Sequence, residues 1–403
     1  MLSKDEAVCF CHKRECHVPA VHLFACGFSC KSVSKLNHHH QANGSTIRDA
    51  TQTATNITFT GAMKYIHRRQ PWVVLFENVE GIMQQSAKGD SNKDWVLKTL
   101  QEEGYYAEAF LTNSCDHGTP QNRLRCYFLA VHVKNPNLCI EAETIVQKTI
   151  KMFSGCRLQP PSLHDLLLPD DSSDIAAVLQ QRKDDRDAEV AKASRKAAKA
   201  HAKAKSKSKI PVGKQEKWIE LHIDQCAKHR IRWPLELQVR NEWTETCTQR
   251  EQQVIAFYQK SHKDLVCVDV YHSLHRAATS CDPYHIGIVL PSTRLWLQSR
   301  GRLAVAKELL RLQCIPWPRH GEDLQLSEAA LGDLAGNAFC GGTVAALMVS
   351  LFSQLDIDSY AADADNRSQA AYHHFMEVIN ITQATQSNTD EPEDAASEGP
   401  EGS

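Results

Sequence analysis

The stretch His22–Asn37 reads HLFACGFSCKSVSKLN and decides how the rest of the sequence is interpreted. An apolar run from Val21 to Ala25 leads through Gly27 to Cys30, and a polar Ser/Lys segment follows. This pattern predicts a strand that delivers a cysteine onto a turn. Open α/β proteins place reactive groups on loops at strand ends, so Cys30 is a nucleophile candidate. The alternative is a structural thiol, because free cysteine is among the most often buried residue types.

The composition describes a chain that can bury a sizeable core. It has 403 residues, of which 42% are hydrophobic, and this length favours two or three domains. A net charge of −2 argues against a globally basic nucleic-acid-binding protein. The first ten residues hold no apolar signal segment, so we expect the 15 cysteines to be reduced in an intracellular or nuclear protein. No run approaches the roughly 20 apolar residues that cross a bilayer, and no membrane partner is expected.

Soft metal ligands gather in residues 1–20, which hold Cys9, Cys11 and Cys16. Their spacing does not match the paired C-x2-C arrangement of zinc modules. Zinc binding therefore stays open beside an unstructured start, and no metal site is assigned.

Alternating helix and strand patterns follow Cys30. Trp72–Phe76 is an unbroken apolar run of the kind found in a strand covered on both faces, and Glu77 and Asn78 come directly after it. Helices are predicted over Ile57–Arg69 and Asp94–Glu103, with further strands over Tyr105–Thr112 and Cys126–Val133.

A row of hydrogen-bond donors precedes the last of these strands. Gln121, Arg123 and Arg125 alternate along a segment that is predicted to be extended. Side chains two residues apart on an extended chain point the same way, so these three are expected to face one site.

Five motifs in this order resemble those of the cytosine-5 DNA methyltransferases. They are Gly-Phe-Ser-Cys ending at Cys30, Glu77-Asn78-Val79, Gln121-x-Arg123-x-Arg125, Arg302-Leu303 with Glu308 and Arg311-Leu312-Gln313, and Gly336-Asn337-Ala338. The resemblance covers most of residues 21–352. It implies an α/β fold with a partial, Rossmann-like S-adenosylmethionine-dependent methyltransferase sheet and an inserted, irregular target-recognition region.

The resemblance also implies a covalent mechanism on DNA. The Cys30 thiolate would add to carbon 6 of a cytosine flipped out of the duplex, which makes carbon 5 enamine-like. Glu77 would donate a proton or hydrogen bond to N3, and Asn78 would orient it. Arg123 and Arg125 would hold the base oxygen and a nearby phosphate and keep Cys30 ionised.

Further residues have implied binding roles. Gln121 and Ser32 match substrate-binding positions. Asn337 and Ala338 match the cofactor motif, which is expected to open the apolar C-terminal helix and to contact S-adenosyl-L-methionine.

Two departures from the family pattern concern the start of the chain. Ser29 stands where proline is usual and Lys31 where glutamine is usual. Nothing before His22 resembles the glycine-rich first motif, which would bring three strands and most cofactor contacts. The strand at Val21–Ala25 would then have an unpaired edge, which natural proteins avoid. We expect either an N-terminal truncation or a second chain that completes the sheet.

The middle of the chain holds a basic segment. Lys192–Lys209 contains eight Lys/Arg and no acid, and Lys196, Lys199 and Lys203 fall on one helical stripe. Such a helix could lie along phosphates, or the segment could be a solvated linker. The predicted organisation is an N-terminal segment 1–20, a catalytic domain 21–150, a linker with a basic helix 151–209, a target-recognition-like region 210–295, a return to the catalytic domain 296–355, and a polar tail 356–403, disordered from about 386.

Three functions remain open. The first is a DNA cytosine-5 methyltransferase, favoured by the joint presence of Cys30, Glu77 and Arg125. The second is an inactive relative that binds nucleic acid or a partner methyltransferase, favoured by the missing glycine loop. The third is a tRNA methyltransferase with the same chemistry.

Overall fold

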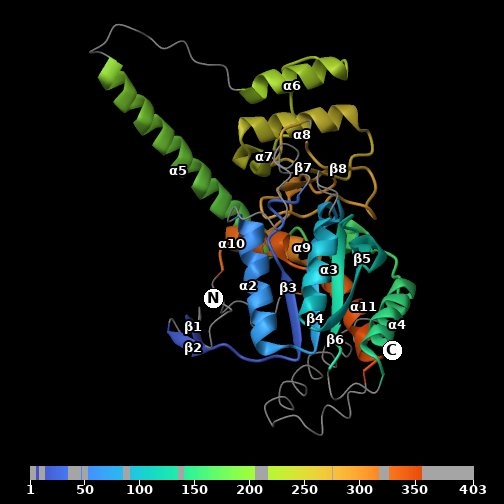
Figure 1. Ribbon diagram of the computed structural model, residues 1–403. Helices are drawn as coiled ribbons and strands as arrows, with labels where there is room; N and C mark the ends of the chain where they lie inside the picture. Colours follow the sequence, from blue (N-terminus) through green and yellow to red (C-terminus); the bar gives the residue numbers. More distant parts are fainter. Residues whose placement is uncertain are drawn as a thin grey trace, which may run out of the picture.

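The computed structural model describes residues 6–8, 14–34, 47, 53–84, 91–134, 140–204, 217–274, 276–316 and 326–355 (Figure 1). Cys9 and Cys11 of the zinc hypothesis and the tail 356–403 lie outside this part of the chain.

The main sheet has four strands in the order β3-β4-β6-β5. β3 (Leu23–Gly27) runs parallel to β4 (Val73–Val79), and β6 (Leu124–His132) lies antiparallel to both β4 and β5 (Tyr105–Asn113). All four are near the predicted positions. Glu77 and Asn78 belong to β4 itself instead of following it, because their backbone continues the pairing with β6.

Helices cover both faces of this sheet (Figure 1). α2 (Ala54–Arg69) and α3 (Asn92–Glu102) pack on one face, where Phe76 and Phe128 are buried. α4 (Ala142–Gly155) and α11 (Gly341–Phe352) pack on the other, where Leu75 and Tyr127 are buried. The alternation of buried side chains along β4 and β6 explains why both strands read as continuous apolar runs.

One edge of the sheet is open. Within the described residues no strand pairs with the outer edge of β3, where Ala25 and Gly27 are exposed. β1 (Glu6–Val8) and β2 (Glu15–His17) pair antiparallel with each other in a separate hairpin. The expectation of an unstructured start is therefore corrected for residues 6–8 and 15–17, which form two paired strands.

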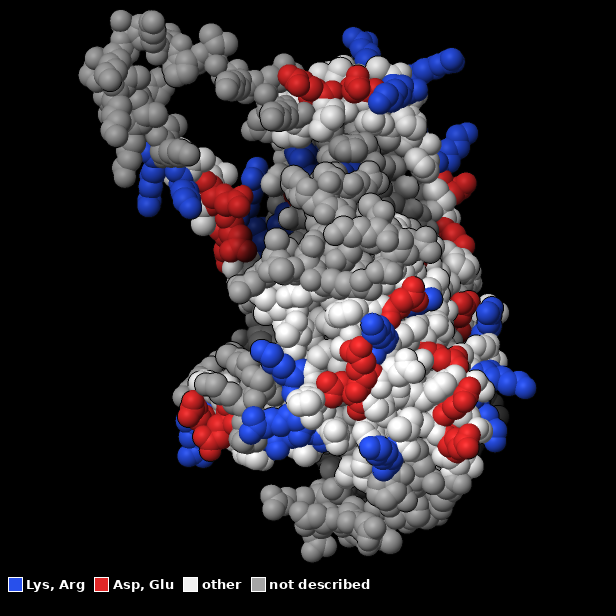
Figure 2. All heavy atoms as spheres, viewed as in Figure 1, with Lys and Arg blue, Asp and Glu red and all other residues white. Residues whose placement is uncertain are grey.

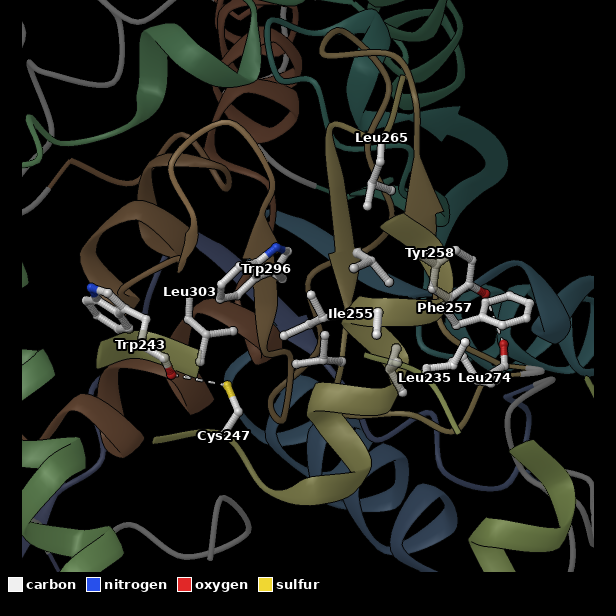
Figure 3. Close-up of a cluster of buried hydrophobic side chains, with 14 of the residues drawn as sticks. Leu235, Trp243, Cys247, Ile255, Phe257, Tyr258, Leu265, Leu274, Trp296 and Leu303 are labelled. Atoms are coloured by element: carbon white, nitrogen blue, oxygen red, sulfur yellow. Dashed lines mark hydrogen bonds between the residues drawn. The ribbon is translucent and has the colours of Figure 1, made fainter. Parts of the chain in front are cut away.

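A second core lies above the carboxyl ends of β3 and β4 (Figures 1 and 3). Its helices are α6 (Lys217–Lys228), α7 (Glu242–Thr246) and α8 (Gln249–Ser261). A small sheet in the order β10-β9-β7-β8 completes it, built from β7 (Cys267–Asp269), β8 (Thr279–Ser280), β9 (Leu295–Leu297) and β10 (Arg302–Leu303). Trp296 is fully buried at its centre, and Tyr258 donates a hydrogen bond to the Leu274 carbonyl (Figure 3).

Two predicted domain boundaries differ from this arrangement. β9 pairs with β7, so residue 295 lies inside the upper region, and the chain returns to the catalytic sheet only after Leu303. The predicted linker contains the 3-10 helix η3 (Leu163–Leu166) and α5 (Ser173–Ala204). Leu168 and Ile175 in this segment are buried in the upper core, so its first half is packed structure.

A buried ion pair joins these pieces. Arg302 donates two hydrogen bonds to Glu308, at 2.8 Å and 2.9 Å, and Glu308 also accepts from the backbone N–H groups of Leu168 and Val305. Glu308 lies in α9 (Ala306–Arg311), which packs beside α10 (Glu328–Asn337). No single described helix is long and apolar enough to cross a membrane, although α10 and α11 pass that test together as a pair bent by 44°.

Candidate active site

Cys30 lies on a tight turn directly after β3, as predicted. Its carbonyl oxygen accepts hydrogen bonds from the N–H groups of Val33 at 3.0 Å and Ser34 at 2.9 Å. The thiol is free and partly exposed. The structure therefore places a partly exposed cysteine near a strand end, and Cys30 is not among the buried residues that the alternative of a structural thiol would require.

Three side chains from other elements hold the turn that carries Cys30. Thr58 and Thr55 of α2 accept hydrogen bonds from the N–H groups of Ser29 and Ser32, at 2.9 Å and 3.0 Å. The Asn78 amide donates to the Phe28 carbonyl at 3.0 Å. Asn78 thus positions the cysteine loop, whereas the sequence indicated that it would orient Glu77. Neither threonine had a signal for this role in the sequence, since Thr58 lay within the predicted helix Ile57–Arg69 and Thr55 preceded it.

Ser32 was expected to bind substrate. It is buried, and its backbone bond to Thr55 makes it part of the support of the loop. The helical turn η1 (Glu80–Met83) supports the same loop from below. A Cβ atom at Gly81 would overlap the Val33 carbonyl oxygen, so only glycine permits this approach.

Glu77 lies at the same sheet edge as the Cys30 loop, because Gly27 pairs with Glu77 in the parallel ladder. Its Oε1 lies 3.0 Å from Arg125 Nε and 3.9 Å from Arg123 Nη2. All three side chains are nearly buried, and two cations beside one carboxylate leave an excess positive charge. Burial, with the neighbouring Arg125, lowers the pKa of Arg123 to about 10, which still leaves it charged at neutral pH.

Two buried polar atoms in this cluster make no hydrogen bond of good geometry within the described part of the chain. Among the described residues no hydrogen bond of good geometry reaches Glu77 Oε1 or Arg123 Nε, although both atoms are buried. Buried polar atoms are normally satisfied, so exceptions of this kind call for an explanation. Glu77 Oε1 therefore has only its ion-pair contacts with Arg125 and Arg123, and Arg123 Nε has no acceptor among the described residues.

The predicted row of Gln121, Arg123 and Arg125 exists, but only its end faces Glu77. Gln121 is fully buried, donates to the Leu312 carbonyl at 3.2 Å and accepts from the Val289 N–H at 2.9 Å. Both ends of its amide are thus occupied by backbone, which makes it a structural bridge in place of the expected substrate ligand.

Arg123 joins the row to distant parts of the chain. Its guanidinium donates to the carbonyls of Val289 and Ala338, both at 3.1 Å. The upper region and the α10–α11 connection are thereby fixed to the arginine that borders Glu77.

Phe339 is a site neighbour that the sequence did not reveal. Its ring packs against Gly27, at the point that also faces Glu77 Oε2. A Cβ atom built on Gly27 would lie 3.4 Å from this ring and 3.5 Å from that oxygen. The ring and the carboxylate therefore border the same small space at the end of β3.

The expected cofactor residues are placed differently from the prediction. Asn337 is the last residue of α10, exposed, and donates to the Asp333 carbonyl one turn earlier. The Ala338 carbonyl accepts from Arg123. The apolar helix α11 begins only at Gly341, and the three residues between α10 and α11 include Phe339, which is partly buried, and Cys340, which is buried.

The described residues do not form a cradle for a nucleotide cofactor. At the start of α11, Cβ atoms on Gly341 and Gly342 would overlap the carbonyl oxygens of Cys314 and His117. Protein backbone therefore packs closely against both glycines and leaves no space for a ligand beside them. The part of the chain that the structure describes also contains no cluster of three or more His, Cys, Asp or Glu side chains that could hold a metal ion.

The chain is an α/β protein, because its mixed sheet has helices on both faces. Its candidate site lies at the ends of strands, where a cysteine loop comes beside a carboxylate. Comparison with known sequences narrows this class. The family model described as C-5 cytosine-specific DNA methylase matches residues 11–348, and the chain therefore belongs to this family.

Curated relatives match over short segments only. The Type II methyltransferase M.NlaIV of Neisseria lactamica is 26% identical over 129 residues, 31% of this chain and 28% of that protein. M.BanI of Aneurinibacillus aneurinilyticus is 34% identical over 77 residues, 19% of this chain and 18% of that protein. The chain thus spans less than a third of the length of these relatives. Among solved structures, the Dnmt2 methyltransferase of S. pombe shares 12% identity over 82% of this chain and 76% of its own, with a TM-score of 0.37.

Proposed function

We propose that this chain is the cytosine-activating part of a DNA cytosine-5 methyltransferase. Family membership supports the reaction class. The observation that carries the assignment to residues is the placement of Glu77 against Arg125 and Arg123, at the strand edge where the Cys30 loop begins.

The residues fit the demands of cytosine chemistry in turn. Carbon 5 of cytosine is a weak nucleophile, and addition of the Cys30 sulfur to carbon 6 makes it enamine-like. The electron density moves toward N3, where Glu77 donates a hydrogen bond or proton. The unused donor of Arg123 and the charge of Arg125 suit the carbonyl oxygen of the base. The target base has to leave the duplex, because carbon 6 is inaccessible within the stack.

S-adenosyl-L-methionine would supply the methyl group, and the described residues do not fit that cofactor. We therefore propose that a second chain adds strands to the outer edge of β3 and brings the cofactor site. The 403-residue chain alone should bind S-adenosylmethionine more weakly than about 100 μM, or about 5.5 kcal/mol. Calorimetry that gives micromolar affinity would contradict this proposal.

Hydrogen exchange at carbon 5 tests the activation step without the methyl donor. When Cys30 adds to carbon 6, carbon 5 takes a proton from water, and elimination of the thiol then releases either the old or the new hydrogen. DNA tritiated at cytosine carbon 5 should therefore lose label to water. Cys30→Ser should reduce this loss at least about 1000-fold, because the covalent step is removed.

Two further variants make this test specific. Glu77→Gln keeps the shape of the site and should slow exchange strongly, whereas Cys115→Ser, which changes a partly buried thiol elsewhere, should not. Equal exchange by the wild type and by Cys30→Ser would exclude Cys30 as the nucleophile. Addition of S-adenosylmethionine with the completing chain should convert the adduct on 5-fluorocytosine DNA into a denaturation-resistant complex.

An inactive relative is the second candidate, favoured by the missing cofactor cradle. It would bind DNA and show no exchange. A tRNA methyltransferase would release label from RNA and not from DNA, so the same assay with both substrates separates all three functions.

A further inference from the structure

Two adjoining cavities lie in the upper region, away from the Cys30 site. One, of about 420 Å³, is lined by Trp218, Tyr271, Arg250 and Arg294 at the start of α8. The other, of about 470 Å³, lies between α5 and α7. Both are lined by Thr248 and Arg294, so they adjoin at these two residues, and we call the two together the α5–α8 groove.

Positive charge exceeds negative charge in the α5–α8 groove. Its cations are Arg182, Arg186, Lys192, Arg250 and Arg294, against the acids Asp185, Glu189 and Glu251. The described part of α5 carries both acidic and basic side chains (Figure 2). The excess of positive charge therefore comes from the lining of both cavities together.

The cations differ in how firmly they are held. Arg294 is fixed by buried Glu251, whose Oε1 lies 2.6 Å from Arg294 Nη1. Within the described part of the chain, no ion pair or hydrogen bond occupies the side chains of Lys192 and Arg250. The groove thus combines one preorganised cation with two that are available to a ligand.

Two aromatic side chains form the wall beside Arg250. Tyr271 is 42% exposed although it belongs to an otherwise buried segment, and Trp218 is partly exposed in α6. Aromatic rings beside arginines are the chemistry that binds unstacked nucleobases together with their phosphates. An acidic peptide would use the cations but would not need the aromatic side chains beside them.

We propose that the α5–α8 groove binds an unpaired stretch of nucleic acid, with one base on Tyr271 and Trp218 and neighbouring phosphates on Arg250, Arg294 and Lys192. The second cavity continues the row of cations, which favours a strand over a free nucleotide. The inference rests on the proposed function only in that the substrate is a nucleic acid, since this groove does not include the Cys30 site.

Fluorescence anisotropy with labelled oligonucleotides tests the groove on the full chain. The probes are a 12-nucleotide single strand, a blunt duplex of the same sequence, and that duplex with a three-nucleotide unpaired overhang. Tyr271→Ala should weaken binding of the single strand and of the overhang duplex about 10-fold, because one stacking contact is lost. Its affinity for the blunt duplex should stay unchanged.

The cations should act through salt dependence. Replacing Lys192 and Arg250 together by Gln should flatten the plot of log K against log salt for the single strand by roughly 1.4, at about 0.7 for each phosphate contact. Tyr271→Ala should leave that slope as it is. Matched controls are Tyr284→Ala, with a tyrosine that is 49% exposed, and Lys98→Gln, with a side chain that is 65% exposed. Both should bind all probes like the wild type.

The outcomes separate this inference from the proposed function. If Tyr271→Ala weakens binding of the blunt duplex and the single strand equally, or weakens neither, the proposal that the groove binds an unpaired strand would be wrong. If adenosine monophosphate competes for the groove as well as the unlabelled 12-mer does, the ligand would be a free nucleotide and not a strand. Carbon-5 exchange on a blunt duplex should be unaffected by Tyr271→Ala. Absent exchange with intact groove binding would overturn only the proposed function.

Discussion

The catalytic sheet and the upper region bury comparable cores by different means. β4, β5 and β6 are seven to nine residues long, and their buried side chains alternate between two helix-covered faces. β7 to β10 are two or three residues long, and their core is completed by short helices and loops. Long elements repeat a pattern often enough to be recognised in a sequence, whereas the short ones are positioned by individual contacts.

Core truncation in each region should produce the largest loss of stability. Trp296→Ala in the upper core and Phe76→Ala in the sheet each remove a fully buried aromatic ring and should cost about 3–5 kcal/mol. We expect both variants to shift one common transition in urea, followed by circular dichroism and tryptophan fluorescence. The reason is that Arg123, Gln121 and Glu308 join the two regions through buried hydrogen bonds. Separate transitions for the two probes would show that the regions unfold independently.

The buried ion pair between the regions should come next. Arg302→Met leaves Glu308 charged and without its main partner and should cost about 3–5 kcal/mol of unfolding free energy. The double variant with Glu308→Leu should recover only part of this loss, because the N–H groups of Leu168 and Val305 then lack an acceptor. Full recovery in the double variant would mean that those two backbone bonds contribute nothing.

A methyl group on Gly81 should have a smaller but more local effect. Gly81→Ala forces η1 away from the Val33 carbonyl and should cost about 1–3 kcal/mol, with a loss of carbon-5 exchange because the Cys30 turn moves. Gly61→Ala is the matched control. Gly61 lies inside α2 with open space around it, so alanine should stabilise the protein by about 0.5–1 kcal/mol. Equal changes in unfolding free energy for Gly81→Ala and Gly61→Ala would contradict the steric overlap with the Val33 carbonyl as the cause.

The smallest expected effect is electrostatic. Partial burial tends to raise the pKa of Asp170, but hydrogen bonds from Arg302 and Arg300 outweigh it and hold that pKa below the ordinary value. Stability from this carboxylate is therefore present above about pH 4 and lost as the pH falls through the lowered pKa. Asp170→Asn should reduce the stability difference between pH 6 and pH 3 by about 0.2–1 kcal/mol. Asp171→Asn, an exposed neighbour, should leave that difference unchanged in acid titrations of unfolding.

The sheet was predictable because its strands carry strong local signals. The turn at Cys30, the apolar run before Glu77 and the donors before β6 are all contiguous in sequence. Gln121 could not be assigned to its bridging role, because its partners Val289 and Leu312 follow more than 160 residues later. Phe339 escaped notice for the same reason, since only the folded chain brings it to Gly27. The predicted helix start at Asn337 was wrong because Asn337 ends α10 and three residues of connection precede α11.

The two carbonyls that hold Arg123 have a consequence for synthesis of the protein. Val289 and Ala338 lie 166 and 215 residues after this arginine, so a ribosome finishes most of the chain before Arg123 can settle beside Glu77. The order of synthesis therefore sets the order in which these two bonds can form, with the Val289 acceptor available before the Ala338 acceptor. A polypeptide that stops before Val289 would leave the Arg123 guanidinium without two of its carbonyl acceptors.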